Sequence, residues 1–449
     1  MAIENSSLYR EILAIINGNS KPVHFSWSAI IHVDKLNYNP LKILSIDFSQ
    51  DYENNYSDEI IITLSILGGT YAKDIYPFKD KVDITLLRTP ITEVAGSTQA
   101  NQLRETERYT ATLLDTGNPI IEGNGANTPT RESLNLTNIF EVSFQLVNKS
   151  LEQMRMMSVG GIYRSVTAID VIKCVLTNEM KKIVVEGIRK PVGVDIIDGY
   201  NKQVREHVVI PHGTKLVNLP EYVHQKCGGI YSSGFGYYFQ KAHWFIYPCY
   251  DTSRFNSASK TLTIINVPRN KFPNIERTYR ADGKNTTIMA TGEVKFRDDS
   301  EVQQLNLGNG VRFSSADNFM SNFSTTTDNK TSVSRGSNNT EVTASPRANG
   351  NNNVHISSDP INSNPFLEYS KLARRQGSMI SLSWENSLPS LVSPGMMVKI
   401  LYLDGDNIAI AYGTLLKTHH YTQMRGIGMT DTRYISNSSL HVFVKQIKK

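Results

Sequence analysis

Alternation of apolar and polar residues with a period of two is the feature that most constrains the fold. Val82, Ile84 and Leu86, for example, are separated by single polar residues. Successive side chains of a strand point to opposite faces, so this pattern predicts strands that bury one face. The same alternation occurs at 44–48, 60–66 and 140–146. We therefore predict a mainly β fold, with a first antiparallel β-barrel domain over 20–152.

Two segments interrupt or precede this predicted barrel. Residues 90–131 are polar and rich in glycine, and we expect them to form an excursion from the barrel, either a long hairpin or a loop. Residues 1–19 carry Leu8, Ile12 and Ile15 at helical spacing. We expect an N-terminal helix or arm that packs on its own chain or on a neighbour.

The middle of the chain changes to helical patterns. Thr167, followed three residues later by Asp170, resembles a helix N-cap, and apolar residues at helical spacing follow it. A second helix is expected after Asn218, ending at Gly228-Gly229. We therefore predict a small α+β module over 153–235.

The remainder of the chain is predicted to be β again, apart from one polar stretch. Residues 236–313 form a β-rich segment that could complete a second barrel, which we place at 366–449. Asp404-Gly405, between apolar alternating runs, is a strong hairpin signal. Residues 314–365 are dominated by Ser, Asn and Thr and predict an extended linker.

Composition excludes several classes of protein. The formal net charge is +5 over 449 residues, and Lys448-Lys449 is the only concentrated basic feature, so charge makes no case for nucleic-acid binding. No apolar run approaches the ~20 residues that a membrane helix needs. Cys174, Cys227 and Cys249 are too far apart for a CxxC pair, and we expect all three to be buried apolar residues.

The sequence offers no convincing catalytic, cofactor or metal site. Neither a Gly-x-Ser-x-Gly elbow nor an HExxH motif occurs. His419-His420 would point to opposite faces of a strand, so they could not chelate one ion without a bulge. The calcium-like run 404–407 has Leu415 where the bidentate Glu belongs, which favours a hairpin turn. The glycines from Gly228 to Gly236 lack a following Lys-Ser/Thr. We therefore predict no catalytic, cofactor-binding or metal residues.

Two motifs rich in tyrosine stand out. The first is Asp51-Tyr52-x-x-x-Tyr56-x-Asp58, which is either an ordinary polar loop or an exposed interface loop. The second is the aromatic run from Tyr231 to Tyr250. Such a run could stack on sugars or bases, but no arginine is interleaved within it, so core packing and a subunit interface are favoured.

Several segments in this order resemble the central baseplate hub (tail hub) proteins of contractile-tailed bacteriophages. They cover most of the chain, and each is weak by itself. The segments that carry the resemblance are 51–88, with Ile75-Tyr76-Pro77; Ile210-Pro211-His212-Gly213-Thr214; Gly228-Gly229-Ile230-Tyr231; Tyr247-Pro248-x-Tyr250-Asp251; Ser383-Trp384; Pro394-Gly395-Met396; and Arg433-Tyr434-Ile435.

The resemblance implies a non-enzymatic structural virion protein of the tail baseplate, assembled in the host cytoplasm. It would form a homotrimer whose two tail-tube-like barrels per chain adapt a sixfold tail tube to a threefold central spike. The implied partners are the tube or tube-initiator protein, the spike protein and the baseplate wedge or sheath-side proteins. The tape measure protein is a further candidate. DNA would only pass through the lumen, and no membrane insertion is implied.

A carbohydrate-active or receptor-binding tail-tip protein is the alternative that the sequence leaves open. The first would need two carboxylates held at a fixed separation, and the sequence gives no reason to choose among Asp58, Glu59 and Asp251. The second would be expected to contain fibrous repeats, which we do not find.

Overall fold

The computed structural model describes residues 7–17, 24–91, 104–114, 138–184, 191–272, 277–292, 311–315, 331–335, 340–344, 355–356, 366–367, 370, 373–374, 376–404, 407–424 and 433–445. Strands dominate, and the helices are few and short. The prediction of a mainly β protein with α+β insertions is confirmed. Among the described residues, no helix combines the length and apolar character needed to cross a bilayer.

The first strand ring is built mostly from the N-terminal third of the chain. Its six main strands are β1 (Phe25–Val33), β3 (Lys42–Asp51), β4 (Glu59–Leu67), β5 (Val82–Pro90), β6 (Glu105–Leu113) and β7 (Ile139–Asn148). They pair in the order β3-β4-β7-β6-β5-β1, and every pairing is antiparallel. The short strand β2 (Leu36–Tyr38) forms a hairpin with β1.

Alternation explains the core of this ring. Every second residue of β4 and β5 is buried, and a helical segment at 68–81 adds Tyr71 and Ile75 to the same cluster. The predicted strands at 44–48, 60–66, 82–86 and 140–146 are confirmed as β3, β4, β5 and β7. The expected excursion at 90–131 contains strand β6, which pairs with both β5 and β7. The rest of that excursion, 92–103 and 115–131, lies outside the described residues.

The second strand ring combines segments that are far apart in sequence. Its strands are β13 (Thr261–Asn266), β15 (Asn285–Ala290), β20 (Gly377–Trp384), β21 (Met397–Asp404), β22 (Asn407–Met424) and β23 (Tyr434–Lys445). They pair in the order β15-β13-β21-β22-β23-β20, and two hydrogen bonds between Thr291 and Ser383 join the ends. Strand β14 (Tyr279–Asp282) pairs with the outside of β15.

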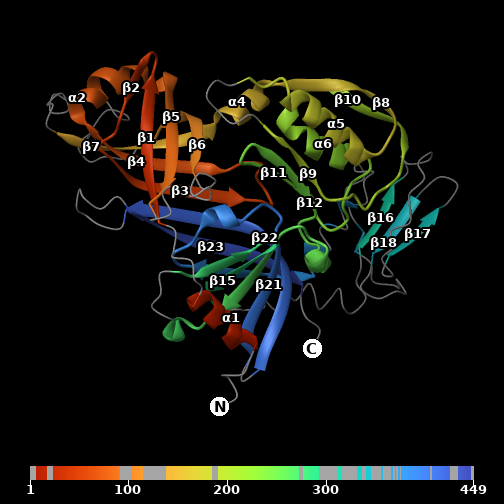
Figure 1. Ribbon diagram of the computed structural model, residues 1–449. Helices are drawn as coiled ribbons and strands as arrows, with labels where there is room; N and C mark the ends of the chain where they lie inside the picture. The colour runs from red at the N-terminus through yellow and green to blue at the C-terminus, as the bar shows by residue number, and fades with distance from the viewer. Residues whose placement is uncertain are drawn as a thin grey trace.

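Two long strands belong to both rings (Figure 1). From Lys417 to Gln423, β22 pairs with β3, while the same residues pair with β23 on the other side. At its start, β23 meets β1 through Tyr434 and Phe25. An irregularity at Leu416 marks the point where β22 passes from one ring to the other. The strand pairing therefore crosses the boundaries expected from the sequence, because the segment 366–449 supplies strands to both rings.

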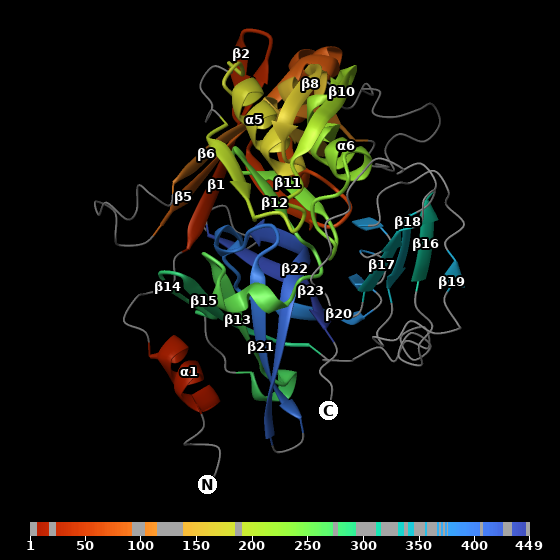
Figure 2. The same cartoon turned by 90° about the vertical axis from the view of Figure 1, so that its right-hand side faces the viewer.

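The middle module packs beside the first ring and above the second (Figures 1 and 2). It comprises α4 (Lys149–Met156), β8 (Ser158–Val166), α5 (Ala168–Met180), β9 (Gly193–Ile196), β10 (Arg205–Lys215), α6 (Leu219–Lys226), β11 (Gly236–Gln240) and β12 (His243–Tyr247). Thr167 caps α5 by accepting a hydrogen bond from the Asp170 amide, as predicted. Helix α6 ends just before Gly228, whose φ of +87° favours glycine, so this helix end is also confirmed.

The predicted N-terminal helix is α1 (Ser7–Ile16), and it lies against the outer face of the second ring. Ile15 is completely buried there, with Ile265, Met289 and Leu401. An amphipathic helix of this length is marginal alone, so contact with the sheet stabilises it.

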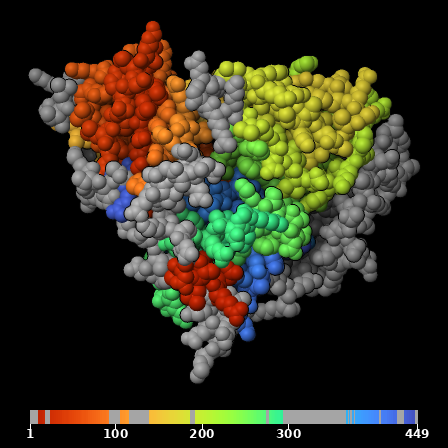
Figure 3. All heavy atoms as spheres, in the orientation of Figure 1, coloured from red at the N-terminus to blue at the C-terminus, as the bar shows by residue number. Residues whose placement is uncertain are grey.

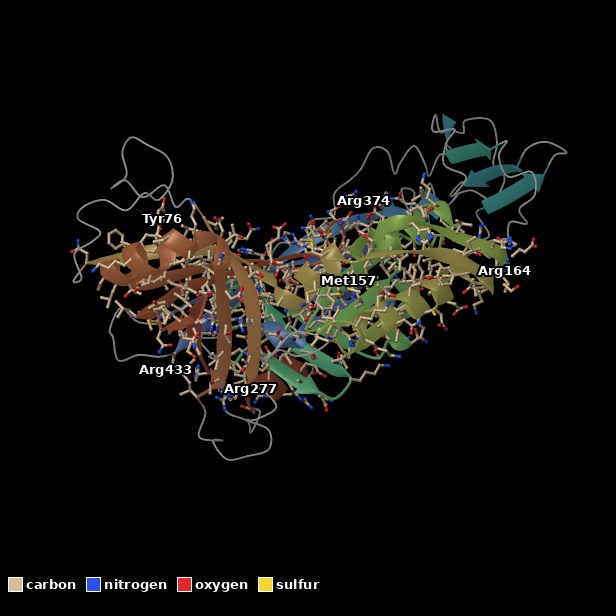
Figure 4. The ribbon with its side chains drawn as sticks, turned by 90° about the horizontal axis from the view of Figure 1, so that it is seen from above. Tyr76, Met157, Arg164, Arg277, Arg374 and Arg433 are labelled. Carbon is tan, nitrogen blue, oxygen red and sulfur yellow. The ribbon has the colours of Figure 1, made fainter. Side chains whose placement is uncertain are left out.

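The Ser/Asn-rich segment differs from the expected extended linker. The structure places three short strands there, β17 (Thr331–Arg335), β18 (Thr340–Ala344) and β19 (His355–Ile356). A fourth, β16 (Val311–Ser315), begins just before the segment, and the four pair in the order β17-β18-β16-β19. Seen from above, the molecule is elongated, with Tyr76 of the first ring and Arg164 of the module near opposite ends (Figure 4).

Candidate functional site: the junction of the two rings and the module

The two tyrosine-rich motifs come together at the place where the rings and the module meet. The loop between β3 and β4 carries the first motif, and the β11–β12 hairpin carries most of the second. The Phe239 amide donates a hydrogen bond to the Tyr56 carbonyl over 2.8 Å, and Ser57 forms an isolated parallel bridge with Phe239. Main-chain pairing therefore links two motifs that are about 180 residues apart in sequence.

Aromatic rings pack across this junction. The rings of Tyr52 and Tyr238 meet edge to face, with centroids 4.8 Å apart, and Tyr56 stacks on Tyr237 at 6.3 Å. Aromatic pairs at such distances contribute about 0.5–1.5 kcal/mol beyond the burial of their surface. Tyr52 is completely buried, so the first motif is an internal contact and the hypothesis of an exposed interface loop is wrong for this residue.

Hydrogen bonds satisfy the polar ends of the buried tyrosines. The Tyr238 hydroxyl donates to Asp58 Oδ1 over 2.8 Å, and Gln50 Nε2 donates to the same oxygen over 2.9 Å. Tyr247 donates to the carbonyl of Tyr52 over 2.7 Å. Buried polar groups with partners in good geometry favour one arrangement of the surrounding chain over others.

The two aspartates of the first motif have opposite electrostatic behaviour. Burial raises the pKa of Asp58 to about 6, although the hydrogen bonds from Tyr238 and Gln50 pull it downward. Asp51 is less buried, and burial raises its pKa less than hydrogen bonds from Asn54 and Lys417 lower it, so the pKa of Asp51 falls below its ordinary value. The loop therefore holds one carboxyl that resists ionisation and one that favours it.

A cavity of about 130 Å³ lies beside the tyrosines, at the end of the first ring. Arg88, which is 5% exposed, lies over the ring of Phe25 at 4.6 Å and forms an ion pair of 2.9 Å with Glu105. Lys241 occupies the tight turn of the β11–β12 hairpin and donates to the Ser390 carbonyl over 3.1 Å. The Lys241 side chain is solvent-exposed, yet protein encloses it closely enough that burial lowers its pKa.

The strand shared by the rings contributes His420 to the same cavity. Its Nδ1 lies 2.6 Å from Ser438 Oγ. The Ser438 hydroxyl donates its proton to Ser387 Oγ, and the Ser387 hydroxyl donates to the Ser436 carbonyl. Because each hydroxyl has one proton to donate, His420 Nδ1 must be the donor to Ser438. Burial lowers the pKa of His420 to about 3, so the ring is neutral at physiological pH.

Sequence reasoning missed the cavity, although one signal was present. Val82, Ile84, Leu86 and Arg88 share one face of β5, so the alternation that predicts the strand also places a guanidinium at the end of an apolar row. A cation at a core-facing position needs a specific environment. Lys241 carried no comparable signal, because its position depends on how the hairpin docks.

The other singled-out residues are dispersed. His419 Nε2 lies 2.7 Å from Asp47 Oδ1, whereas its neighbour His420 is buried on the opposite face. Asp404 pairs with Asn407 at a tight hairpin end, and the two residues between them lie outside the described part. Cys227 and Cys249 are buried, but Cys174 is exposed, so the prediction for Cys174 is wrong. Within the described ranges, no group of three or more His, Cys, Asp or Glu side chains could hold a metal ion.

No protein-family model matches the sequence, and no curated protein matches it. Solved structures do resemble it. The 43 kDa tail protein of prophage MuSo2 from Shewanella oneidensis has a TM-score of 0.43 and 9% identity, over 92% of this chain and 98% of that one. A type VI secretion system component of Escherichia coli is described as structurally similar to bacteriophage T4 tail proteins. It has a TM-score of 0.41 and 8% sequence identity, over 93% of this chain and 77% of that one.

A PdpA–VgrG complex of Francisella gives a TM-score of 0.36 with 9% identity, over all of this chain and 63% of that longer one. The first two neighbours are thus described as a phage tail protein and as a secretion component with structural similarity to tail proteins.

Proposed function

We propose that this chain is a structural subunit of a phage-type tail, and that three copies form the hub of the baseplate. The observation that carries the proposal is the pair of strand rings joined by β22 and β23. Three such chains in a closed cyclic assembly would present six rings around one axis. A sixfold tail tube could then dock on one side of the hub and a threefold spike on the other.

The shared strands support this proposal on physical grounds. An adapter needs its two modules held at a fixed mutual angle, since a flexible linker would let each module take many orientations. Here the connection is continuous sheet, and the junction beneath it is filled by buried tyrosines with hydrogen-bonded hydroxyls. In this proposal the junction has a mechanical role, and the chain acts as a structural protein and not as an enzyme.

Further parts of the proposal follow from the resemblance of the sequence to tail hubs. The partners would be the tube or tube-initiator protein, the spike protein and the wedge or sheath-side proteins. DNA would pass along the axis of the trimer without specific binding. The domain boundaries at 152, 235, 313 and 365 are proposed from the sequence. The second ring joins strands that precede 313 with strands that follow 365, and the β11–β12 hairpin, which follows 235, packs with the module.

Analytical ultracentrifugation of the purified chain, followed by electron microscopy, tests the proposal. We expect a stable trimer of about 150 kDa, three times the 50.3 kDa of the chain, with six density lobes around an open axial channel. A monomer that cleaves cell-wall glycan would overturn the proposal in favour of a carbohydrate-active protein. A trimer without an axial channel would exclude the passage of DNA.

A further inference from the structure

The hairpin formed by β21 and β22 extends beyond its neighbouring strands. Strand β13 pairs with β21 only as far as Leu401, and β23 pairs with β22 only from Gly413 onward. Among the described residues, the outer part of the hairpin (402–404 with 407–412) is therefore a ribbon of two strands. It reaches the lower end of the molecule in Figures 1 and 2.

One face of this hairpin is apolar and largely exposed, although Tyr412 at its base packs against the ring of Phe255 with centroids 5.4 Å apart. Leu403, Ile408, Ile410 and Tyr412 lie on the same face, because Leu403 is directly opposite Ile408 and Leu401 is opposite Ile410. Their exposed fractions lie between 36% and 45%. Nearer the base, helix α1 covers the same face and leaves Leu401 only 9% exposed. We call the four exposed residues the hairpin face.

An isolated two-stranded ribbon with open edges and exposed apolar side chains is unfavourable in water. Hairpins of two strands are marginally stable alone, and open edges with apolar faces promote association. A contiguous apolar patch on a protein surface commonly marks an interaction site. Helix α1 already covers this sheet face at Leu401, so the exposed residues Leu403, Ile408 and Ile410 continue an existing apolar contact.

The outer surface of the first ring also carries exposed apolar side chains, at the two ends of a row on β4 that Thr63 and Ser65 interrupt. On the outer side of β4 and β7, Ile61, Leu67 and Ile139 are exposed by 39–55%, and Leu67 is directly opposite Ile139. Exposed Glu59 and Glu141 flank them on the same two strands. We call these five residues the β4–β7 face.

Most of the charged side chains around the two faces are of opposite sign, although Lys42 also lies on the outer side of the first ring, opposite Ser65. Lys399 lies opposite Tyr412 in the register, on the same side of the sheet as the hairpin face. Arg269 and Lys271 are exposed immediately before Phe272, which packs against the cluster beneath α1. A basic rim around one apolar face and acidic residues around the other would guide their encounter and fix their orientation.

We propose that the hairpin face of one chain docks on the β4–β7 face of a second copy, head to tail. This inference rests on the proposed trimer, for which it names the contact surfaces. Within one chain the hairpin lies at the lower end and β4 and β7 at the upper left of the molecule, so the two faces do not meet (Figures 1 and 3). Head-to-tail contacts between different surfaces close into rings when the rotation between copies allows it.

Paired charge insertions test each face. One double variant carries Ile408→Asp together with Ile410→Asp, and the other carries Ile61→Asp together with Ile139→Asp. Both are studied by sedimentation of the full chain. Both should lose the trimer and weaken association at least tenfold. The control is Ile162→Asp with Val209→Asp, an exposed opposite pair on the β8–β10 ribbon, which lies in the module. This control should remain trimeric, and circular dichroism should show native strand content in all three variants.

Mixing the two defective variants gives the sharper result. The hairpin variant keeps an intact β4–β7 face, and the β4–β7 variant keeps an intact hairpin face. Their equimolar mixture should therefore form a dimer through the one remaining contact and should not form a ring. A dimer formed by either variant alone would reveal a self-complementary interface, and either that result or the absence of any dimer in the mixture would overturn the head-to-tail assignment.

The outcomes separate this inference from the proposed function. If the wild-type chain is a trimer and either charged pair leaves it intact, the assigned surfaces are wrong and the hub proposal stands. If the wild-type chain is not a trimer, the hub proposal itself fails. If aspartate disrupts folding of the hairpin, Ile408→Thr with Ile410→Thr keeps β-branched residues there and should still weaken the trimer.

Discussion

The two strand rings reach similar burial by different means. The interior of the first ring is filled mainly by aliphatic side chains and aromatic rings from strands close together in sequence, and Tyr434 of β23 is the distant contribution among the buried residues of this cluster. The second ring takes strands from segments about 100 residues apart, and its core includes Tyr52, Tyr238 and Tyr247 from the junction. The first ring therefore depends mainly on local pairing, and the second depends on the junction being formed.

Truncation of one large core residue in each ring should show this difference most strongly. Trp384→Ala and Phe144→Ala should each reduce the free energy of unfolding by about 3–5 kcal/mol. Trp384 also donates its indole N–H to Thr278 Oγ1 over 2.8 Å. We expect hydrogen exchange to speed up at β11 and β12 in Trp384→Ala but not in Phe144→Ala. Equal effects of both variants on the junction would contradict the comparison.

The pH dependence of stability should be governed in part by the junction. The pKa of Asp58 is raised in the folded state, so the folded protein binds more protons than the unfolded chain between pH 4 and 6. Stability contributed by this group is therefore lost as pH rises through that window, by about 3 kcal/mol at most. Asp58→Asn should raise the thermal midpoint at pH 7 and leave it unchanged at pH 4.

Asp51 provides the control for this experiment, since it lies in the same loop and has a lowered pKa. Its contribution is present above its ordinary pKa and is lost as pH falls through the folded value. Asp51→Asn should therefore lower the midpoint at pH 7, and this effect should shrink as the pH is lowered below the ordinary value of 3.8. The same sign for both variants at pH 7 would contradict the electrostatic description of the loop.

Removal of single hydroxyl groups compares a charged acceptor in the junction with a neutral one in the first ring. Tyr238→Phe removes a hydrogen bond to Asp58 and should cost about 1.5–3 kcal/mol at pH 7. Tyr434→Phe removes a bond of 3.0 Å to the Ile43 carbonyl and should cost about 0.5–1.5 kcal/mol. Chemical denaturation measures both values, and the reverse order would show that the junction is less tightly organised than the first ring.

The smallest expected effect concerns the ion pair at the point where the shared strand enters the first ring. Lys417 Nζ lies 2.6 Å from Asp51 Oδ2, and the lysine side chain is 38% exposed. Solvent screens such a pair, so Lys417→Met should change stability by less than about 1 kcal/mol. The change should shrink further at 1 M salt, and a loss that is independent of salt would indicate packing of the lysine stem instead.

Local pattern predicted the elements well, because burial of one strand face leaves a period-two signature. It placed β4, β5 and β7, the cap at Thr167 and the helix end before Gly228. It could not show that β22 changes rings at Leu416, since the buried residues of its second half, Thr418, His420 and Thr422, are polar and leave no apolar alternation to follow. Pairing partners depend on long-range contacts that a single strand does not encode.

The candidate site was predictable in its parts but not as a whole. Both tyrosine-rich motifs were visible, yet nothing local indicated that Tyr56 would stack on Tyr237 or that Tyr238 would bind Asp58. The exposure of Tyr52 was predicted wrongly for the same reason. A loop rich in tyrosine and acidic residues is usually exposed unless another segment of the chain covers it. Here the β11–β12 hairpin supplies that cover.

The shared strands also set the order in which the chain can mature during synthesis. All six main strands of the first ring have left the ribosome once residue 148 is exposed, but the edges of β1 and β3 stay open until residues 417–434 follow. Domains that fold as units during translation usually finish before the next one emerges. In this chain the first ring stays incomplete, with exposed strand edges, until β22 and β23 are synthesised. The same two strands also complete the second ring.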